Sequence, residues 1–253
     1  MMKSSNPALS ERIFAKERAN TSTEVMTIEG TKFKTITMLA LVVLGAVYTW
    51  RLAMLQSPLV NTWMIVGGIG GFITALITVF SPRNAHITAP IYSVLEGLLL
   101  GGLSAFMAAQ YGLGIISQAV GLTFATFFFM LILYRSGTIK VTAKFRMAVF
   151  AATGAIALMY FLSFILSFFG VDLGYLHQGD TPGTVSTFSI IISLVVIGVA
   201  AFNLLLDFDF IERGVNQGAP KYMEWYAAFG LMVTLIWLYI EILRLLAKVN
   251  SRK

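Results

Sequence analysis

The chain has 253 residues, of which 57% are hydrophobic and only 12% are charged. A soluble domain usually carries about 25% charged residues, so this chain has too little polar surface to cover a water-soluble globule. It contains no cysteine, which excludes disulfides and thiol chemistry, and its net charge of +6 comes from Lys and Arg residues that lie between apolar blocks. We therefore expect an integral membrane protein in contact with the lipid bilayer, without a nucleic-acid partner.

A polar N-terminal tail, residues 1–34, is followed by seven apolar blocks. Crossing a bilayer takes about 20 residues of helix, and each block is long enough. Lipid offers no partner to an unpaired amide, so the blocks are expected to be α-helices, and none alternates as a barrel strand does. We predict an all-α polytopic membrane protein with a transmembrane domain over 35–250. Its helices are predicted at 35–55, 62–80, 88–110, 113–134, 146–169, 186–206 and 223–246.

The connections between the blocks differ in length and character. Only Tyr111 and Gly112 separate the third block from the fourth, which predicts a tight antiparallel hairpin. The connection over 170–185 is the longest and is expected to be a surface loop, whereas 207–222 is charged and could continue the sixth helix beyond the bilayer. In the tail, a short amphipathic helix could form over residues 9–19.

The distribution of basic residues predicts the orientation. The N-terminal tail and the connections on its side carry 13 Lys and Arg residues, whereas the side that holds the C-terminus carries 5. Connections rich in Lys and Arg stay in the cytoplasm. We therefore expect the N-terminus to be cytoplasmic and the C-terminus to lie across the membrane.

Glu96 lies well inside the third block. A carboxylate there costs about 2.5–3.5 kcal/mol on insertion scales and is rare without a function. Ser93 is three residues earlier and lies on the same helix face. One interpretation is structural, a protonated carboxyl hydrogen-bonded to a neighbouring helix. The other, which we prefer, is a proton or cation site that faces an internal cavity.

A second acidic cluster, Asp207, Asp209 and Glu212, ends the sixth block. Residues two apart point about 200° apart on a helix, so Asp207 and Asp209 cannot share a face. Asp209 can pair with Arg213 at i+4, and together with Glu212 it is expected to be solvated at the helix end. Asp207 shares its face with Asn203, so both should point towards whatever the helix packs on. For Asp207, a structural role and a proton-sensing role are equally open.

Two further glutamates lie in the seventh block. Glu224 is at its start, where a carboxylate suits the positive end of the helix dipole, and Glu241 is expected to form an interfacial pair with Arg244 at i+3. No Lys or Arg lies in the middle of any block, so Glu96 and Asp207 have no obvious neutralising cation. Such a buried carboxyl can exchange a proton near physiological pH or bind a hard cation through its oxygens.

The remaining motifs predict structure rather than chemistry. The glycine-rich segment 67–71 and the pair Gly97 and Gly101 lie inside apolar blocks, which indicates close helix packing and not a phosphate loop. The two histidines, His86 and His177, lack metal-ligand spacing, and the sequence leaves a metal site undetermined. No hydrolase triad, GxSxG elbow or HExxH motif is found, so we predict neither an enzyme nor a cofactor, apart from transient Ca²⁺.

Four segments, taken in their order and spacing, resemble one family. They are 90–97 (PIYSVLEG) in the third block, 207–211 (DFDFI) at the end of the sixth, 6–9 (NPAL) in the tail and 218–226 (GAPKYMEWY) before the seventh. Together they are similar to the Bax inhibitor-1 family, within the transmembrane Bax inhibitor motif superfamily. They look most like its bacterial branch, described as Bax inhibitor-1/YccA-like. The resemblance covers nearly the whole chain.

The resemblance implies six helices packed around a central, C-terminal seventh, and a pH-dependent calcium leak. In that family, one aspartate that ends the sixth helix and another within the seventh act together as the proton sensor. Asp207 matches the first. The second has no match, because 230–235 contains no acidic residue. Glu96, Asp209 and Glu224 are the candidates to replace it.

Three functions are compatible with these expectations. The first is a pH-sensitive cation (calcium) leak channel, gated by protonation of Asp207 or Glu96, with Asn203, Ser93 and Arg213 in support. The second is a non-conducting regulator that binds a membrane protease or another membrane protein through its tail and loops. The third is a proton-coupled transporter of a small solute. The bacterial-branch resemblance favours the bacterial inner (cytoplasmic) membrane.

Overall fold

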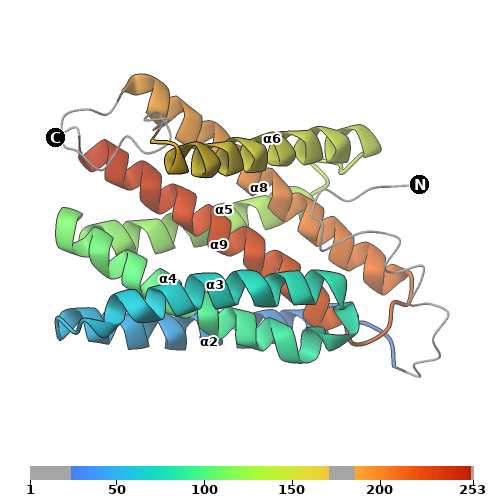
Figure 1. Cartoon of the computed structure of the whole chain (residues 1–253). Coiled ribbons are helices and arrows are strands. Elements are labelled where there is room, and N and C mark those ends of the chain that lie inside the picture. The colour runs from blue at the N-terminus through green and yellow to red at the C-terminus, as the bar shows by residue number, and fades with distance from the viewer. Residues whose placement is uncertain (1–23, 171–185, 252–253) are drawn as a thin grey trace. The chain divides into compact units, whose positions relative to one another are not determined.

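A computed structural model of the chain describes residues 24–170 and 186–251. The described residues form long α-helices, a 3₁₀ turn η1 (Pro82–Asn84) and an isolated antiparallel bridge between Val25 and Pro220, with no longer strand among them. The segment 9–19 and nearly all of the connection 170–185 lie outside the described residues. The helices, labelled in Figure 1, are α2 (Ile28–Met54), α3 (Leu59–Phe80), α4 (Ala85–Tyr111), α5 (Gly114–Arg135), α6 (Ala143–Phe168), α8 (Thr187–Asn216) and α9 (Met223–Asn250).

Within the described residues, seven helices are long and apolar enough to cross a membrane, which confirms the predicted all-α membrane fold. Several extend past the apolar block that predicted them. The helix α2 begins at Ile28, well before residue 35, because the Thr27 hydroxyl accepts a hydrogen bond from the amide of Gly30 at 2.9 Å and caps the helix. Likewise, α8 continues through the charged residues to Asn216. At the start of α2, a side-chain cap rather than hydropathy sets the helix end.

The chain forms two compact units. Unit 1 consists of Met1–Gln110 and Asp207–Val233, so it holds α2, α3, nearly all of α4, the last turns of α8 and the first turns of α9. Unit 2 consists of Tyr111–Leu206 and Thr234–Lys253, with α5, α6, most of α8 and the rest of α9. Because α8 and α9 each contribute a part to both units, their residues are assigned to one unit or the other below.

Among the seven helices, α9 is the most buried. In its most apolar stretch 67% of the residues are buried, against 56% for α4 with η1 and 11% for α6. In unit 1, Phe229 of α9 packs edge-on against Tyr92 of α4, with ring centroids 5.0 Å apart. In unit 2, Glu241 of α9 accepts a hydrogen bond from Tyr160 of α6. These contacts with several helices agree with the central C-terminal helix that the resemblance implies.

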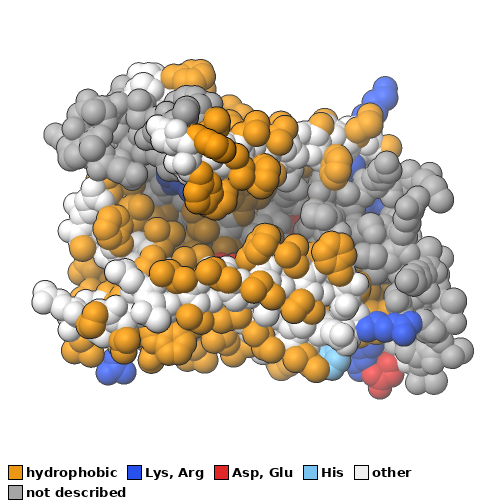
Figure 2. Space-filling model, viewed as in Figure 1, with side chains coloured by type: hydrophobic (Ala, Val, Ile, Leu, Met, Phe, Trp, Pro, Cys, Tyr) orange, Lys and Arg blue, Asp and Glu red, His pale blue; other side chains and the backbone are white. Residues whose placement is uncertain are grey.

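The outward faces of the helices are apolar. The side chains of Phe150, Phe161 and Phe164 on α6 are all exposed. Figure 2 shows hydrophobic side chains spread along the visible helices, with Lys, Arg, Asp and Glu side chains mainly towards the helix ends. Water would disfavour so much exposed apolar surface, whereas lipid accepts it. The helices are therefore membrane spans, and the chain is an integral membrane protein.

Candidate functional site

The helix α4, which carries Glu96, packs closely on both α2 and α3 in unit 1. A Cβ atom on Gly67 of α3 would lie 2.5 Å from the carbonyl oxygen of Leu95, and one on Gly45 of α2 would lie 2.5 Å from that of Val94. Only glycine permits backbones to approach so closely. The close packing predicted for the glycine motif is thus confirmed at Gly67, and the two contacts hold α4 in place directly before Glu96.

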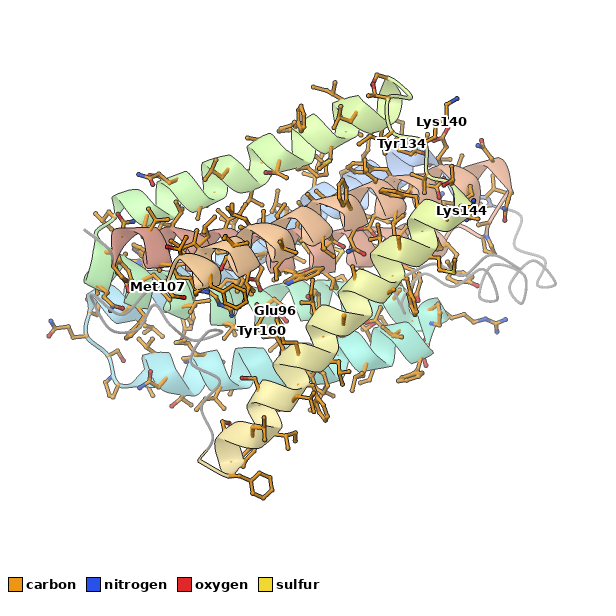
Figure 3. All side chains as sticks on the ribbon, turned by 90° about the horizontal axis from the view of Figure 1, so that it is seen from above. Glu96, Met107, Tyr134, Lys140, Lys144 and Tyr160 are labelled. Atoms are coloured by element: carbon orange, nitrogen blue, oxygen red, sulfur yellow. The ribbon has the colours of Figure 1, made fainter. Side chains whose placement is uncertain are left out.

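The carboxylate of Glu96 lies half-buried against α3, near the middle of α4 (Figure 3). A Cβ atom on Gly71 would lie 2.9 Å from its Oε1. The buried Tyr92, one turn earlier, is within electrostatic range of it. Ser93 donates its hydroxyl hydrogen to the carbonyl of Ala89 at 3.0 Å, within its own helix. Across residues 24–170 and 186–251, no hydrogen bond or ion pair reaches the Glu96 carboxylate.

A proline makes α4 locally weaker on the N-terminal side of Glu96. Pro90 lies inside the helix and has no amide hydrogen, so the helical hydrogen bond to the carbonyl of His86 cannot form. Just before the proline, α4 is tied to α3 by a hydrogen bond of 2.7 Å between the hydroxyls of Thr78 and Thr88. The proline therefore sits between two fixed contacts, the threonine pair and the Glu96 segment.

The acidic cluster at the end of α8 divides into three environments. Asp207 is 1% exposed. Asp209 forms the predicted i+4 pair with Arg213, with 2.8 Å between Oδ2 and Nη2, and its side chain is only 14% exposed. Glu212 is exposed. The expected solvation is therefore wrong for Asp209, because the phenylalanines on either side of it are buried and this turn of α8 is packed rather than frayed.

Asn203 is one turn before Asp207 on α8 and belongs to unit 2. It is buried, as expected for a residue that points at neighbouring helices. Its side-chain amide donates hydrogen bonds to the hydroxyl of Thr153 on α6 at 2.8 Å and to the carbonyl of Val199 at 2.9 Å. Asn203 therefore helps to hold α8 on α6, in the turn that leads to Asp207.

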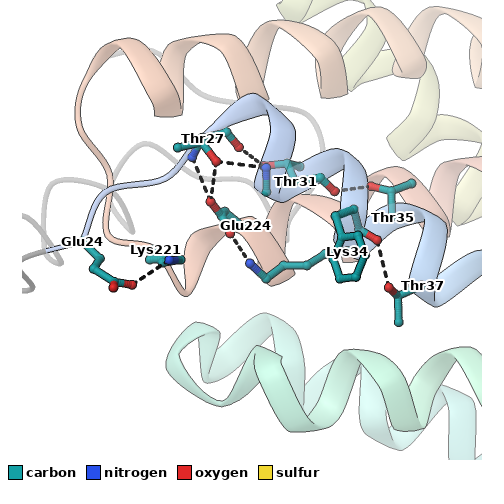
Figure 4. Close-up of polar contacts among 10 residues, drawn as sticks. Glu24, Thr27, Thr31, Lys34, Thr35, Thr37, Lys221 and Glu224 are labelled. Atoms are coloured by element: carbon teal, nitrogen blue, oxygen red, sulfur yellow. Dashed lines mark hydrogen bonds and ion pairs between the residues drawn. The ribbon is translucent and has the colours of Figure 1, made fainter.

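Glu224 is fully buried in the first turn of α9. Its Oε1 accepts two hydrogen bonds of 2.9 Å from Thr27, one from the amide and one from the hydroxyl. Its Oε2 forms an ion pair with Lys34 of α2 (Figure 4). Since donors occupy both oxygens, this carboxylate ties α9 to α2, and a structural role accounts for it.

Unit 2 holds a charged cluster between α6 and α9. Glu241 and Arg244 form the predicted i+3 pair, with 3.1 Å between Oε1 and Nη1, and Glu241 is 2% exposed. Tyr160 joins the pair: its hydroxyl donates to Glu241 Oε1 at 3.0 Å and accepts from Arg244 Nη1 at 2.7 Å. The Arg244 guanidinium also lies 5.3 Å from the centre of the Tyr160 ring.

Sequence reasoning missed two members of these clusters. Tyr160 and Lys248 are not among the residues predicted from the sequence. Lys248 is buried in α9 and donates a hydrogen bond of 3.0 Å to the Ser193 hydroxyl. The available signal was helical spacing, because Glu241, Arg244 and Lys248 follow one another at i+3 and i+4 on one face of α9. Helical spacing on α9 could not have identified Tyr160 on α6 or Ser193 on α8, because these partners lie on other helices.

Across residues 24–170 and 186–251, no three His, Cys, Asp or Glu side chains gather closely enough to hold a metal ion. A cation at Glu96 would find one carboxylate, with water or backbone oxygens as its other ligands.

Helices of membrane-spanning length, seven among the described residues, carry buried carboxylates within each unit and define a polytopic membrane protein with ionisable groups in its spans. Groups of this kind are expensive in lipid and usually mark ion or proton sites. The family described as Bax inhibitor 1 like matches residues 6–251, and the chain belongs to this family. Comparison with curated proteins and with solved structures finds no match. The family agrees with the resemblance carried by segments 90–97 and 207–211.

Proposed function

We propose that this protein is a pH-sensitive cation leak channel, with calcium as the ion, gated by protonation of intramembrane carboxylates. Membership of the Bax inhibitor 1 like family and the enclosed carboxylates support the proposal. On account of the basic residues on its side, the N-terminus is assigned to the cytoplasm, and the bacterial inner membrane is the proposed location.

The observation that carries the proposal is the position of Glu96. The carboxylate lies half-buried on a glycine of α3, and among the described residues neither a basic side chain nor a hydrogen-bond donor reaches it. An ionised carboxylate in this position is costly unless a proton, water or a cation satisfies it. A purely structural glutamate would have donors, as Glu224 has from Thr27 and Lys34.

Asp207 is the second gating group in the proposal. It is almost fully buried on α8, within the same unit as Glu96, and it matches the sixth-helix aspartate of the family sensor. Because Asp209 is already paired with Arg213 and Glu224 with Lys34, Glu96 is the best candidate for the second sensor carboxyl. The proposal is thus a sensor made of one carboxyl on α8 and one on α4.

Protonation would act by removing a charge from a packed contact between helices. The neutral carboxyl of Glu96 can stay against Gly71, whereas the ionised form draws water or a cation towards it. These two forms favour different packings of α4 on α3. Pro90 gives α4 a position at which it can bend while the contact at Thr78 and Thr88 persists.

Calcium flux into liposomes that contain the purified protein, measured across a pH series, tests the proposal. Protein-free liposomes are the control for passive leak. The wild type should show a pH-dependent flux, and Glu96→Gln and Asp207→Asn should shift or abolish the pH dependence, because neither amide titrates. Glu29→Gln is a matched control, since Glu29 is an exposed carboxylate on α2 whose partner is Lys32.

The outcomes separate the candidate functions. Wild-type flux and pH response in both variants would contradict the gating mechanism. Absence of flux at every pH, from folded protein, would favour the non-conducting regulator, which should lose partner binding when residues 1–23 of the tail are deleted. Proton movement that requires an added solute would favour the transporter.

A further inference from the structure

The chain just before α2 is joined to the turn between α8 and α9. Two main-chain hydrogen bonds connect them, from the Met26 amide to the Ala219 carbonyl at 2.7 Å and from the Lys221 amide to the Glu24 carbonyl at 3.1 Å. The side chain of Met26 is buried. All of these residues belong to unit 1, although they are far apart in the sequence.

Between the two hydrogen bonds, Val25 and Pro220 form an isolated antiparallel bridge. They occupy the position of a non-hydrogen-bonded pair, in which neither residue donates its amide to the other. Proline fits this position because it has no amide hydrogen to donate. Within the described residues no further pair joins this bridge, so the main chain from residue 24 onwards provides only a short and exposed connection, in which Val25 is 53% exposed.

Side chains provide the stronger part of the connection (Figure 4). Buried Glu224 accepts hydrogen bonds from the amide and the hydroxyl of Thr27 and forms an ion pair with Lys34, whose ammonium group also lies 5.7 Å from the centre of the Trp225 ring. Hydrogen bonds to a charged group are among the strongest in proteins. By contrast, the pair between Lys221 and Glu24 is exposed on both sides and contributes little.

We propose that residues 24–27 form a strap, which Glu224 holds against the α8–α9 turn, and that opening of the strap is a control point for the protein. The strap is short, and Glu224 is its buried polar anchor among the residues that the structure describes, so loss of Glu224 is expected to release it. It leads directly from the N-terminal tail, so a force or a binding event on the tail acts first on the strap. The turn that it restrains follows the helix end that carries Asp207 and Asp209.

A cysteine pair in this cysteine-free chain tests whether the strap is closed and what holds it. Non-hydrogen-bonded antiparallel pairs have Cα atoms about 4.5 Å apart, which a disulfide can span. The double variant Val25→Cys with Pro220→Cys should therefore cross-link readily under mild oxidation. Adding Glu224→Ala should slow cross-linking by roughly tenfold or more, because the charge-assisted anchor is lost. Thr27→Val should slow it less, because the amide of residue 27 and Lys34 still bind Glu224. Adding Glu29→Ala, on the exposed face of α2, should leave the rate unchanged.

The same double variant tests the control point, and this part rests on the proposed leak. In liposomes, the oxidised protein should carry less calcium flux than the reduced protein at each pH, and Thr27→Val, which needs no loss of Glu224, should carry more than the wild type. If the cross-linking rate is the same with and without Thr27→Val or Glu224→Ala, the role of Glu224 is overturned. Equal flux from oxidised and reduced protein, in a preparation that conducts, would overturn the control point. Absence of calcium flux from every form would contradict the proposed channel. The cross-linking rates would still show whether the strap is closed and whether Glu224 holds it.

Discussion

Replacing Gly67 by alanine should destabilise the protein, although alanine is the better helix former by about 1 kcal/mol. The new Cβ atom would lie 2.5 Å from the carbonyl oxygen of Leu95 and 2.8 Å from the amide nitrogen of Leu99. Both are backbone atoms that cannot rotate away, so α3 and α4 would have to separate. Overpacking costs about 1–3 kcal/mol, and the upper end applies when backbone must move, which leaves a net loss of about 2 kcal/mol.

Gly68 is the matched control for this prediction. A Cβ atom there would meet only the Leu99 side chain, at 3.8 Å, so Gly68→Ala should stabilise the protein by about 1 kcal/mol. Denaturant unfolding in detergent micelles should therefore separate the two variants by about 3 kcal/mol. Equal stabilities of the two variants would refute the argument that close backbone contact with α3 holds α4 in place. The same result would remove the support that this contact gives to the position of Glu96.

Three further predictions concern stability. Arg244→Met should destabilise the protein more than the double change Arg244→Met with Glu241→Gln, because the single change leaves the buried Glu241 carboxylate without its cation. A double-mutant cycle should give a coupling free energy on the order of 1 kcal/mol. Additive effects of the two substitutions would contradict the cluster. Thr142→Ala should cost about 1 kcal/mol in the same assay through loss of the α6 cap, which Thr142→Ser should keep. Glu24 raises the pKa of Lys221, so the small stabilisation from this exposed pair is full at neutral pH and is lost as the pH rises through that raised pKa. Unfolding curves of the wild type and Glu24→Gln should therefore converge in strong alkali, and a difference that persists there would contradict the pairing.

Features that depend on neighbours in the sequence could be predicted. The seven helices follow from the length and composition of the apolar blocks, because a helix is the structure that satisfies its own amides in lipid. Helical spacing predicted the pairs of Asp209 with Arg213 and of Glu241 with Arg244. The position of the glycine-rich segment 67–71 inside an apolar block indicated close helix packing, which is found at Gly67. The family followed from four segments taken together, which is why no single motif was needed.

The tertiary structure decided which polar groups are buried and which partners they have. Asp209 is enclosed although it was expected to be solvated, and Lys248 is buried although it lies near a basic chain end. Glu224 accepts a hydrogen bond from Thr27, which is 197 residues away in the sequence. Helical periodicity relates a residue only to positions three or four away, whereas contacts between helices depend on how the helices pack, and many pairings of seven apolar helices satisfy the same composition. For this reason the sequence determined the spans and the short-range ion pairs. Only packing determined that Glu96 lies against a glycine, with no cation beside it in the part of the chain that the structure describes, while both oxygens of Glu224 have partners.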